Sequence, residues 1–314
     1  MLTSFDCPEC AFAGNKMNRS PKRSAKGSAP GTVLLQQSRQ EHFPDLTGDD
    51  RAPLELMMRF SLLGSGSKGN AVYIEGGGSA ILIDAGFSGK ELEARMQGID
   101  RNLSCIAGIF LTHEHDDHIC GAGVVSRRYR IPLHANAGTL RGAEKRIGRP
   151  HTIHEFATGE EVVCGGLTVR SFPISHDTID PVGFVVSDGR HRLGYCTDTG
   201  KVTHLIERRL GGCEALIVEF NHNLDMLRNG PYPLPLQQRV RSVTGHLSNE
   251  QGAEALARLI ADHLQVVVLA HLSETNNTPA LARGAALAAV AEWGDTTLAI
   301  AEQHRPLELI ELRH

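Results

Sequence analysis

Residues 105–118 have the sequence Cys-Ile-Ala-Gly-Ile-Phe-Leu-Thr-His-Glu-His-Asp-Asp-His. The first seven of these residues are apolar and predict a buried strand, which leads directly into an H-x-H-x-D-H arrangement. In an extended segment His113 and His115 project to the same side. A turn into a following helix would bring Asp117 and His118 round to face them. Because neutral imidazole and carboxylate suit zinc, manganese or iron(II), the segment predicts a metal site at a strand end.

Histidine is abundant in this chain, with 16 in 314 residues. At the chain's own frequencies of His and Asp, the H-x-H-x-D-H pattern arises by chance roughly 0.002 times, so coincidence is a poor explanation. Single residues of the same ligand types follow other apolar runs, namely His176, Asp198 and His271. Each of these alone would be an ordinary loop or capping residue. Together with the cluster they predict two metal sites that share one carboxylate.

Composition limits the classes of function. The chain has 32 Lys and Arg against 36 Asp and Glu, a net charge of −4, so any anionic partner must be held by local basic patches or by metal. A strongly basic nucleic-acid binder is thereby excluded. No apolar run of 18 residues and no signal-peptide pattern occurs, and the seven scattered cysteines fit a reducing compartment. We therefore expect a cytoplasmic protein with no membrane partner.

The chain divides near residue 57. Residues 1–57 lack apolar periodicity and predict a disordered leader, although a true start at Met57 or Met58 would explain the switch equally. Two sheets with helices outside account for the rest better than one doubly wound sheet, because the middle of the chain is meandering β and the ends are mixed. The predicted strands are 59–63, 71–75, 80–84, 105–111, 131–134, 161–164, 167–174, 182–187, 192–197, 214–220, 266–270, 296–301 and 307–312. The predicted helices are 89–97, 121–130, 137–146, 202–209, 249–261 and 279–291.

Three polar segments contain residues that are not among the predicted metal ligands and that require another explanation. The Gly/Ser loop 64–70 could meet an anion with its backbone N–H groups, and a plain flexible turn explains it equally well. Glu219 ends a predicted strand in the sequence Glu-Phe-Asn-His. Residues 245–249, Gly-His-Leu-Ser-Asn, precede a predicted helix in which Ser or Asn could be the N-cap. Capping does not explain His246.

These motifs together resemble the metallo-β-lactamase fold, an α/β architecture built as a four-layer αβ/βα sandwich, from about residue 59 to the end. Residues 58–314 would then form one hydrolase domain. The resemblance implies two divalent metal ions, zinc or manganese. One would be held by His113, His115 and His176, the other by Asp117, His118 and His271, and Asp198 would bridge them. It also implies that Asp84, in Ile-Leu-Ile-Asp-Ala-Gly, orients ligands without binding metal.

Within that fold the run of motifs is similar to the bacterial YycJ/WalJ group. The motifs are Gly-Ser-Gly-Ser-x-Gly-Asn (64–70), Thr-His-Glu-His-x-Asp-His (112–118), Thr-Asp-Thr-Gly (197–200), Glu-x-Asn-His (219–222), Gly-His-Leu-Ser-Asn (245–249) and Ala-His-Leu-Ser-x-x-Asn-Asn-Thr-Pro (270–279). The similarity implies a metal-dependent phosphodiesterase, a 5′→3′ exonuclease acting on double-stranded DNA through a hydroxide activated by two metals. Two departures from the group's pattern are Asn223, where Asp is expected, and Lys68, in place of a small residue. Neither belongs to the implied ligands.

The same similarity implies roles around the metals. Asp117 would accept the proton of the attacking water, and His246 would protonate the leaving 3′ oxygen or bind the scissile phosphate. Glu219 would orient or tune His246. Contacts to substrate are implied for Ser65, Ser67, Lys68, Asn70, Asn221 and His222.

Two other classes of function remain open. The fold hosts many chemistries, so a small-molecule thioester or lactone hydrolase is an alternative, and a metal-stabilised regulatory or scaffold protein is another. Binding of a nucleic-acid backbone needs local positive charge. The candidate groups are residues 127–130, Arg141 with Lys145 and Arg146, and Arg239 with Arg241, each of which could equally be a solvated helix face.

Overall fold

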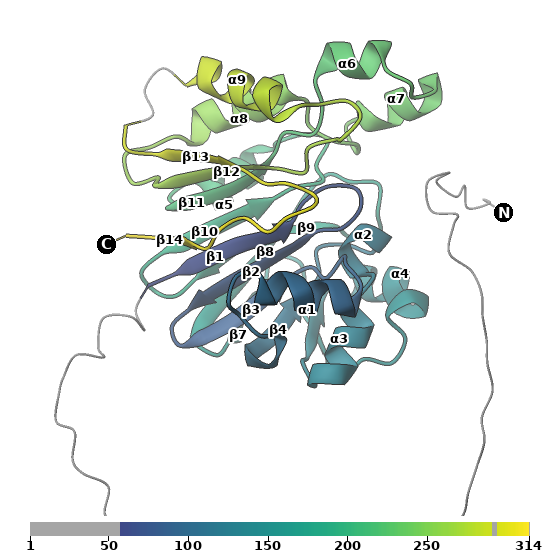
Figure 1. Ribbon diagram of the computed structural model, residues 1–314, viewed down its shortest axis with the longest axis vertical. Helices are drawn as coiled ribbons and strands as arrows, with labels where there is room; N and C mark the ends of the chain where they lie inside the picture. Colours follow the sequence, from purple (N-terminus) through teal and green to yellow (C-terminus); the bar gives the residue numbers. More distant parts are fainter. Residues whose placement is uncertain (1–56, 291–293, 314) are drawn as a thin grey trace, which may run out of the picture. The chain divides into compact units, whose positions relative to one another are not determined.

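The computed structural model describes residues 57–290 and 294–313, which form two seven-stranded sheets packed face to face (Figure 1). Helices cover the outer face of each sheet. This is the four-layer sandwich expected from the sequence. The expected leader, apart from Met57, lies outside the described residues.

The first sheet is mixed and has the order β14-β1-β2-β3-β4-β5-β6. β1 pairs antiparallel with β14 and β2, and β2 pairs antiparallel with β3. From β3 to β6 the neighbours run parallel. The strands are β1 (Arg59–Gly64), β2 (Ala71–Gly76), β3 (Ser79–Ile83), β4 (Ile106–Phe110), β5 (Leu133–Ala135), β6 (Ile153–Glu155) and β14 (Ile310–Glu311).

The second sheet has the order β13-β12-β11-β10-β9-β8-β7. Neighbours from β7 to β10 are antiparallel, and neighbours from β10 to β13 are parallel. The carboxyl ends of β10, β11 and β12 therefore meet at one edge of the sheet. The strands are β7 (Glu161–Cys164), β8 (Leu167–Pro173), β9 (Val182–Ser187), β10 (Arg192–Cys196), β11 (Ala215–Glu219), β12 (Val266–Ala270) and β13 (Thr297–Ile300).

Apolar side chains form three clusters that hold the layers together. One cluster lies between the sheets, a second joins the first sheet to α1, α3 and α4, and a third joins the second sheet to α5, α8 and α9. In Figure 1, α8 and α9 lie on the side of β12 and β13, and α1 and α3 on the side of β3 and β4. The helices of these layers are α1 (Gly89–Gln97), α3 (Ala122–Tyr129), α4 (Ala137–Ile147), α5 (His204–Leu210), α8 (Asn249–Leu259) and α9 (Pro279–Ala289).

The predicted strands and helices are all present, with ends displaced by a few residues at most. Among the described residues, the structure adds five short elements that the sequence did not predict: the 3-10 helix η3 (Leu103–Cys105), α2 (Asp116–Ile119), α6 (Leu224–Asn229), α7 (Leu234–Val240) and the strand β6. All three side chains of β6 are exposed, and α7 buries no side chain. Neither element therefore has the periodic spacing of apolar residues from which a strand or helix is predicted. Prolines at positions 231, 233 and 235 also favour a loop around the start of α7.

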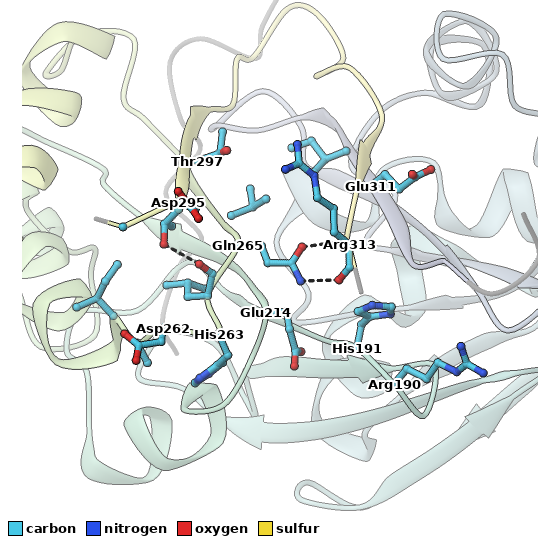
Figure 2. Close-up of a pocket in the computed structure, with 17 residues that line it drawn as sticks. Arg190, His191, Glu214, Asp262, His263, Gln265, Asp295, Thr297, Glu311 and Arg313 are labelled. Atoms are coloured by element: carbon cyan, nitrogen blue, oxygen red, sulfur yellow. Dashed lines mark hydrogen bonds between the residues drawn. The ribbon is translucent and has the colours of Figure 1, made fainter. Parts of the chain in front are cut away.

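A cavity of about 1080 Å³ opens at the edge of the second sheet where β11, β12 and β13 begin (Figure 2). Its lining includes Glu214, Gln265 and Thr297, and Gln265 Nε2 donates a hydrogen bond of 2.8 Å to the carbonyl oxygen of Arg313. The predicted ligands Asp198 and His271 lie at the opposite end of this part of the sheet, after the carboxyl ends of β10 and β12. The cavity is therefore separate from the histidine cluster.

Among the residues that the structure describes, no helix is both long enough and apolar enough to span a membrane.

Candidate metal centre

The predicted ligands converge because each follows the carboxyl end of a strand. His113, His115, Asp117 and His118 follow β4 in the first sheet, whereas His176 follows β8, Asp198 follows β10 and His271 follows β12 in the second. In open sheets the carboxyl ends of parallel strands are the usual place for ligand-binding residues. The two sheets thus bring their ligand-type side chains together at one edge of the sandwich.

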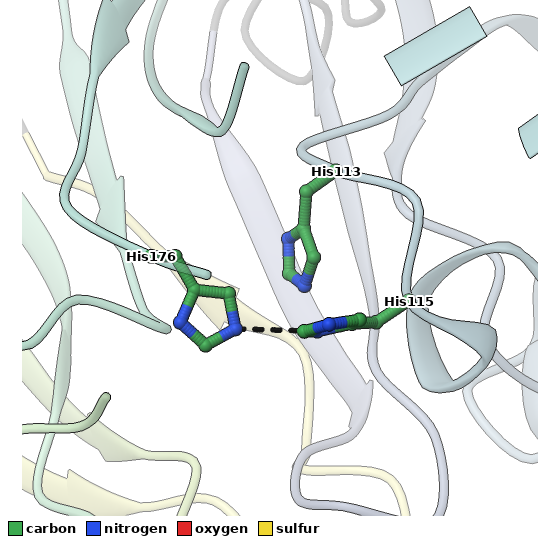
Figure 3. Close-up of side chains that lie close together, drawn as sticks. All are labelled: His113, His115 and His176. Carbon is green, nitrogen blue, oxygen red and sulfur yellow. Dashed lines mark hydrogen bonds between the residues drawn. The ribbon is translucent and has the colours of Figure 1, made fainter. Parts of the chain in front are cut away.

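The first group consists of His113, His115 and His176, which point toward one another in Figure 3. Their facing nitrogen atoms all lie within 4.8 Å of one another. His176 Nε2 is 3.2 Å from His115 Nδ1, and the rings of His113 and His176 have centroids 5.0 Å apart. Three convergent imidazole nitrogens form a donor set typical of a zinc-type site.

The second group consists of Asp117, His118 and His271, and its ligand atoms also lie within 4.8 Å of one another. His118 Nε2 is 3.5 Å from Asp117 Oδ2, and His271 Nε2 is 3.9 Å from the same oxygen. The short helix α2 turns Asp117 and His118 back toward the strand ends. This is the turn that the sequence predicted after His115.

Asp198 lies between the two groups. Its carboxylate is 3.3 Å from His271 Nε2 through Oδ1 and 3.5 Å from His118 Nε2 through Oδ2, and it also forms a close group with His113 and His118. Three atoms in these groups are buried and make no hydrogen bond: Asp198 Oδ2, His113 Nε2 and His271 Nε2. Buried polar atoms are nearly always satisfied, so these atoms indicate that the site is built for a cation.

The electrostatics differ between the two groups. Burial lowers the pKa of His113 well below its usual value and also lowers the pKa of His115 and His176, so these rings are neutral donors. Burial alone would lower the pKa of His271 as well, but Asp198 and the other carboxylates raise it to about 10. The carboxylates around the second group therefore favour positive charge there, whether a proton on the imidazole rings or a bound cation.

Hydrogen bonds behind the ligands orient most of the imidazole rings. Nδ1 of His176 lies 3.2 Å from the carbonyl oxygen of Gly245, and Nδ1 of His118 lies 2.8 Å from Asp84 Oδ2. Nδ1 of His271 lies 3.1 Å from Glu219 Oε1. An Nδ1–H bonded to oxygen leaves Nε2 as the nitrogen that faces the centre.

Asp84, at the end of β3, has the orienting contacts that the sequence resemblance implied. It is fully buried, and Thr112 donates to it from its backbone N (2.9 Å) and from its hydroxyl Oγ1 (2.9 Å). Thr112 Oγ1 also lies 3.0 Å from His113 Nδ1. The sequence analysis missed Thr112, although it stands directly before the His cluster.

Three residues of the centre have a left-handed backbone although none is glycine: Asp84 (φ 60°), Asp198 (φ 57°) and His271 (φ 56°). Such a conformation is unfavourable for residues with a Cβ atom and is concentrated at functional sites. Asp84 and His271 directly follow β3 and β12, and only Thr197 separates Asp198 from the end of β10. The sharp backbone turn is what directs the side chain into the centre.

Glu219 and His246 adjoin the second group. Glu219 is fully buried, and its Oε1 lies 2.7 Å from His246 Nδ1 and 3.1 Å from His271 Nδ1. Its Oε2 accepts a hydrogen bond of 2.9 Å from the backbone N of Thr199. Burial by itself would raise the pKa of Glu219, but the two histidines hold it at about 2. Glu219 is thus an anion that connects a ligand histidine to the half-buried His246.

The Gly/Ser loop lies against the centre, but its polar residues face different ways. Ser65 is buried, and its hydroxyl accepts a hydrogen bond of 2.8 Å from the backbone N of His271. Asn70 is buried and donates to Asp117 Oδ2 at 3.2 Å. Ser67 and Lys68 are exposed, and Lys68 Nζ is 2.7 Å from Glu274 Oε2.

The two predicted substrate contacts after β11 are also buried. Asn221 Nδ2 donates to the carbonyl oxygen of His271 at 3.0 Å and lies 3.3 Å from its Nδ1. His222 is 1% exposed, and neither of its ring nitrogens makes a hydrogen bond. Burial lowers the pKa of His222 to about 4, so its ring is neutral.

Asp177 is a second residue of the centre that the sequence analysis missed, although it directly follows His176. Its Oδ1 is 3.6 Å from His176 Nε2 and 3.9 Å from His115 Nε2. Its Oδ2 accepts a hydrogen bond of 2.6 Å from Arg239 Nε of α7. Asp177 therefore connects the first ligand group to a helix that the sequence did not predict.

Residues 79–272 match the family model of the beta-lactamase superfamily domain. The chain belongs to the beta-lactamase superfamily. Its two-sheet sandwich is the one expected from the sequence resemblance, and the chain is a metallo-β-lactamase-fold hydrolase with candidate His/Asp metal-binding groups.

Among members of the superfamily, the chain is similar to two bacterial nucleases. It is 39% identical to exodeoxyribonuclease YycJ of Bacillus anthracis over 228 residues, which is 72% of this chain and 86% of the relative. It is 36% identical to exodeoxyribonuclease WalJ of Streptococcus pneumoniae over 232 residues, which is 73% of this chain and 86% of the relative. The expected similarity to this group is confirmed.

Solved structures show the same superfamily fold. The metallo-beta-lactamase fold protein YhfI of Bacillus subtilis matches with a TM-score of 0.64 and 17% identity, over 81% of this chain and 99% of that protein. Zn²⁺-bound PqqB of Methylobacterium extorquens matches with a TM-score of 0.59 and 20% identity, over 80% and 99%. At these identities the match concerns the fold alone.

Proposed function

We propose that the protein is a metal-dependent phosphodiesterase that degrades double-stranded DNA from the 5′ end. The observation that carries this proposal is the meeting of two ligand groups at Asp198, directly beside the Glu219–His246 pair. The relatives named exodeoxyribonuclease support it, because they match over most of their length.

The donor set fits divalent metal ions. Imidazole nitrogens and carboxylate oxygens are ligands that zinc and manganese accept, and three of the atoms are buried without a hydrogen bond. When bound, two such ions would activate a water molecule for attack on phosphorus and neutralise the developing charge. In this assignment His113, His115 and His176 would hold one ion, Asp117, His118 and His271 would hold the second, and Asp198 would serve both.

The proton transfers are assigned to two side chains of the chain itself. Asp117 accepts the proton of the attacking water at its other carboxylate oxygen, because Oδ2 faces His118 and His271 and accepts a hydrogen bond of 3.2 Å from Asn70 Nδ2. His246 donates a proton from Nε2 to the leaving 3′ oxygen, because Glu219 occupies its Nδ1. Breaking the phosphorus–3′-oxygen bond leaves a 5′ phosphate on the shortened strand.

Substrate contacts are assigned to the exposed part of the Gly/Ser loop. Ser67 and Lys68 would hold the terminal phosphate, with the ammonium of Lys68 exchanging Glu274 for phosphate. We assign the buried residues a different role, that of holding ligands from behind. These residues are Ser65 and Asn221 at His271, and Asn70 at Asp117 and His118. The buried His222, whose backbone pairs with Ser248, is assigned no contact with substrate.

Digestion of end-labelled nucleic acids tests the proposal. The protein is incubated with Mn²⁺, Zn²⁺ or a chelator and with duplex DNA, single-stranded DNA or RNA carrying a label at one end. We expect the 5′ label of duplex DNA to be released at once, the 3′-labelled strand to shorten progressively, and the chelator to stop both reactions. First release of the 3′ label or preference for RNA would contradict the proposal. Hydrolysis of thioesters or lactones without digestion of duplex DNA would replace it.

A further inference from the structure

The stretch between Asp225 and Glu250 is basic, although Arg228 at its start pairs with Asp225. Residues 226–249 contain Arg228, Arg239 and Arg241 but no Asp or Glu, although the chain as a whole has a net charge of −4. We call residues 226–245 the α7 segment, after the helix at their centre. In Figure 1, α6 and α7 project on the side of the sandwich that also carries α2 and α4.

The α7 segment adds little to the core of the protein. α7 buries no side chain, and Leu234 and Val243 are 65% and 62% exposed. The ion pair of Arg239 with Asp177 is half exposed, and pairs of this kind contribute about 0–1 kcal/mol to stability. Neither burial nor this ion pair explains why the chain forms a helix here.

The segment nevertheless fits closely against the metal centre. The backbone N of His246 donates to the carbonyl oxygen of Val240 at 2.8 Å, and the carbonyl oxygen of Gly245 lies 3.2 Å from Nδ1 of the ligand His176. A methyl group on Gly200, two residues after Asp198, would lie 2.4 Å from the carbonyl oxygen of Ser242. The residues that follow the carboxyl end of α7 therefore pack directly against the metal centre.

The other two predicted basic groups differ in position. Arg127 donates to the carbonyl oxygen of Ile147, and Arg128 pairs with Glu93, so both lie on the outer helical layer of the first sheet. Arg146 pairs with Asp116 beside α2, but the exposed Glu144 lies on the same helix. The third group, Arg239 and Arg241, differs from the other two in two respects. Arg239 contacts Asp177, next to the predicted ligand His176, and the α7 segment itself contains no Asp or Glu.

We propose that the α7 segment binds the sugar-phosphate backbone of the nucleic-acid substrate, with Arg239 and Arg241 contacting phosphates next to the scissile bond. The partner follows from charge complementarity, because a local positive surface suits a polyanion and cations held at the adjacent centre would add to the attraction. The inference rests on the proposed nuclease function. It adds a binding surface on one identified side of the metal centre.

The test is the salt dependence of binding by the full chain with Mn²⁺. Affinity for a fluorescent, phosphorothioate-linked duplex of about 30 base pairs is measured by anisotropy between about 50 and 300 mM NaCl. Each phosphate contact contributes about 0.9 to the slope of log affinity against log salt, so Arg239→Gln and Arg241→Gln should each lower the slope by about that amount. The double variant should lower it by about twice as much.

Arg258→Gln is the matched control. Arg258 is half exposed and pairs through Nε with Glu207, as Arg239 pairs with Asp177, but it lies on α8. This control should keep the wild-type slope. Arg241→Gln leaves the Asp177 ion pair intact, so it tests the surface even if Arg239→Gln disturbs His176.

The outcomes separate the two proposals. A wild-type protein that neither binds nor digests duplex DNA overturns the proposed function. A wild-type protein that digests duplex DNA, with unchanged slopes in both variants, overturns the α7 inference alone. A dimer in solution that Leu234→Ser dissociates, again with unchanged slopes, would assign this face to a second copy of the chain instead.

Discussion

Oε1 of Glu219 lies 2.7 Å from Nδ1 of His246. The same oxygen lies 3.1 Å from Nδ1 of His271, so one buried carboxylate orients both a ligand histidine and a histidine at the rim. The two histidines share this carboxylate, but they direct their other ring nitrogen, Nε2, differently. His271 turns Nε2 toward Asp198, whereas Nε2 of His246 is the nitrogen to which our proposal assigns protonation of the leaving oxygen.

Replacement of His246 by Ala should slow turnover of duplex DNA by roughly 10²-fold or more, because the leaving oxygen loses its proton donor. Metal content, measured by elemental analysis on the same preparation, should be unchanged. A parallel loss of metal and activity would instead make His246 a ligand.

Replacement of Glu219 by Gln should affect both metal and turnover. The amide cannot act as an anionic acceptor for His246 and His271 at the same time, and loss of a partner behind a ligand typically weakens metal binding by about 10–100-fold. Metal titration and steady-state kinetics measure the two effects separately. Full metal affinity in Glu219→Gln would contradict the shared orientation of the two rings.

Replacement of Asp84 by Asn should weaken metal binding by about 10–100-fold, because His118 Nδ1 loses its carboxylate partner. Asp100→Asn is the matched control, since Asp100 also has a positive φ (55°) but is exposed. Competition with a chromogenic chelator measures the affinity of each variant. Equal affinities in the two variants would show that the position of Asp84 has no role in metal binding.

Replacement of Gly86 by Ala should destabilise the fold by about 1–3 kcal/mol, because the new methyl group would lie 1.7 Å from the carbonyl oxygen of Asp117. Gly284→Ala should act in the opposite direction. Gly284 is exposed on α9 with open space around it, and Gly to Ala inside a helix stabilises by about 1 kcal/mol. Urea unfolding of both variants gives the two signs, and a neutral Gly86→Ala would mean that Asp117 can move away freely.

Stability should fall in mild acid because of His134. Its ring is buried, stacks on Phe110 with centroids 4.3 Å apart, and has no hydrogen bond at either nitrogen, and burial lowers its pKa to about 4. The unfolded chain binds this proton more tightly, so the contribution is complete above about pH 6.5 and is lost as pH falls toward 4.

Melting temperatures between pH 7 and 4 measure this effect. His134→Leu should flatten the profile, whereas His204→Leu, at a fully exposed side chain, should leave it as in the wild type. If the His134→Leu profile keeps the wild-type slope, other groups cause the acid sensitivity.

Periodicity and spacing predicted much of the molecule. The apolar run before His113 predicted β4, and the alternation of later strands predicted two sheets rather than one. The ligand residues followed from their positions after apolar runs, because a strand that ends at a sheet edge delivers the next side chain to that edge. These features could be predicted because each depends on residues that are neighbours in the sequence.

Other parts of the site depend on contacts between distant segments. The resemblance implied that Glu219 orients or tunes His246, but nothing near Glu219 in the sequence indicates that the same oxygen would also contact His271, which is 52 positions away. Asn221 is a polar residue of a type that often contacts substrate. In the structure its side chain is buried and donates a hydrogen bond to the carbonyl oxygen of His271. α7 was missed because a helix with three nearby prolines and no buried face has no sequence period.

A protein engineer who wished to transplant this centre onto another sandwich would need more than its side chains. Asp84, Asp198 and His271 leave their strands through left-handed bends, each of which is unfavourable by about 1–3 kcal/mol outside a supporting framework. On strands that simply continued in extended geometry, the same carboxylates and imidazole would point away from the cation. The transferable unit is therefore the set of bent strand ends, together with the packing that keeps them bent.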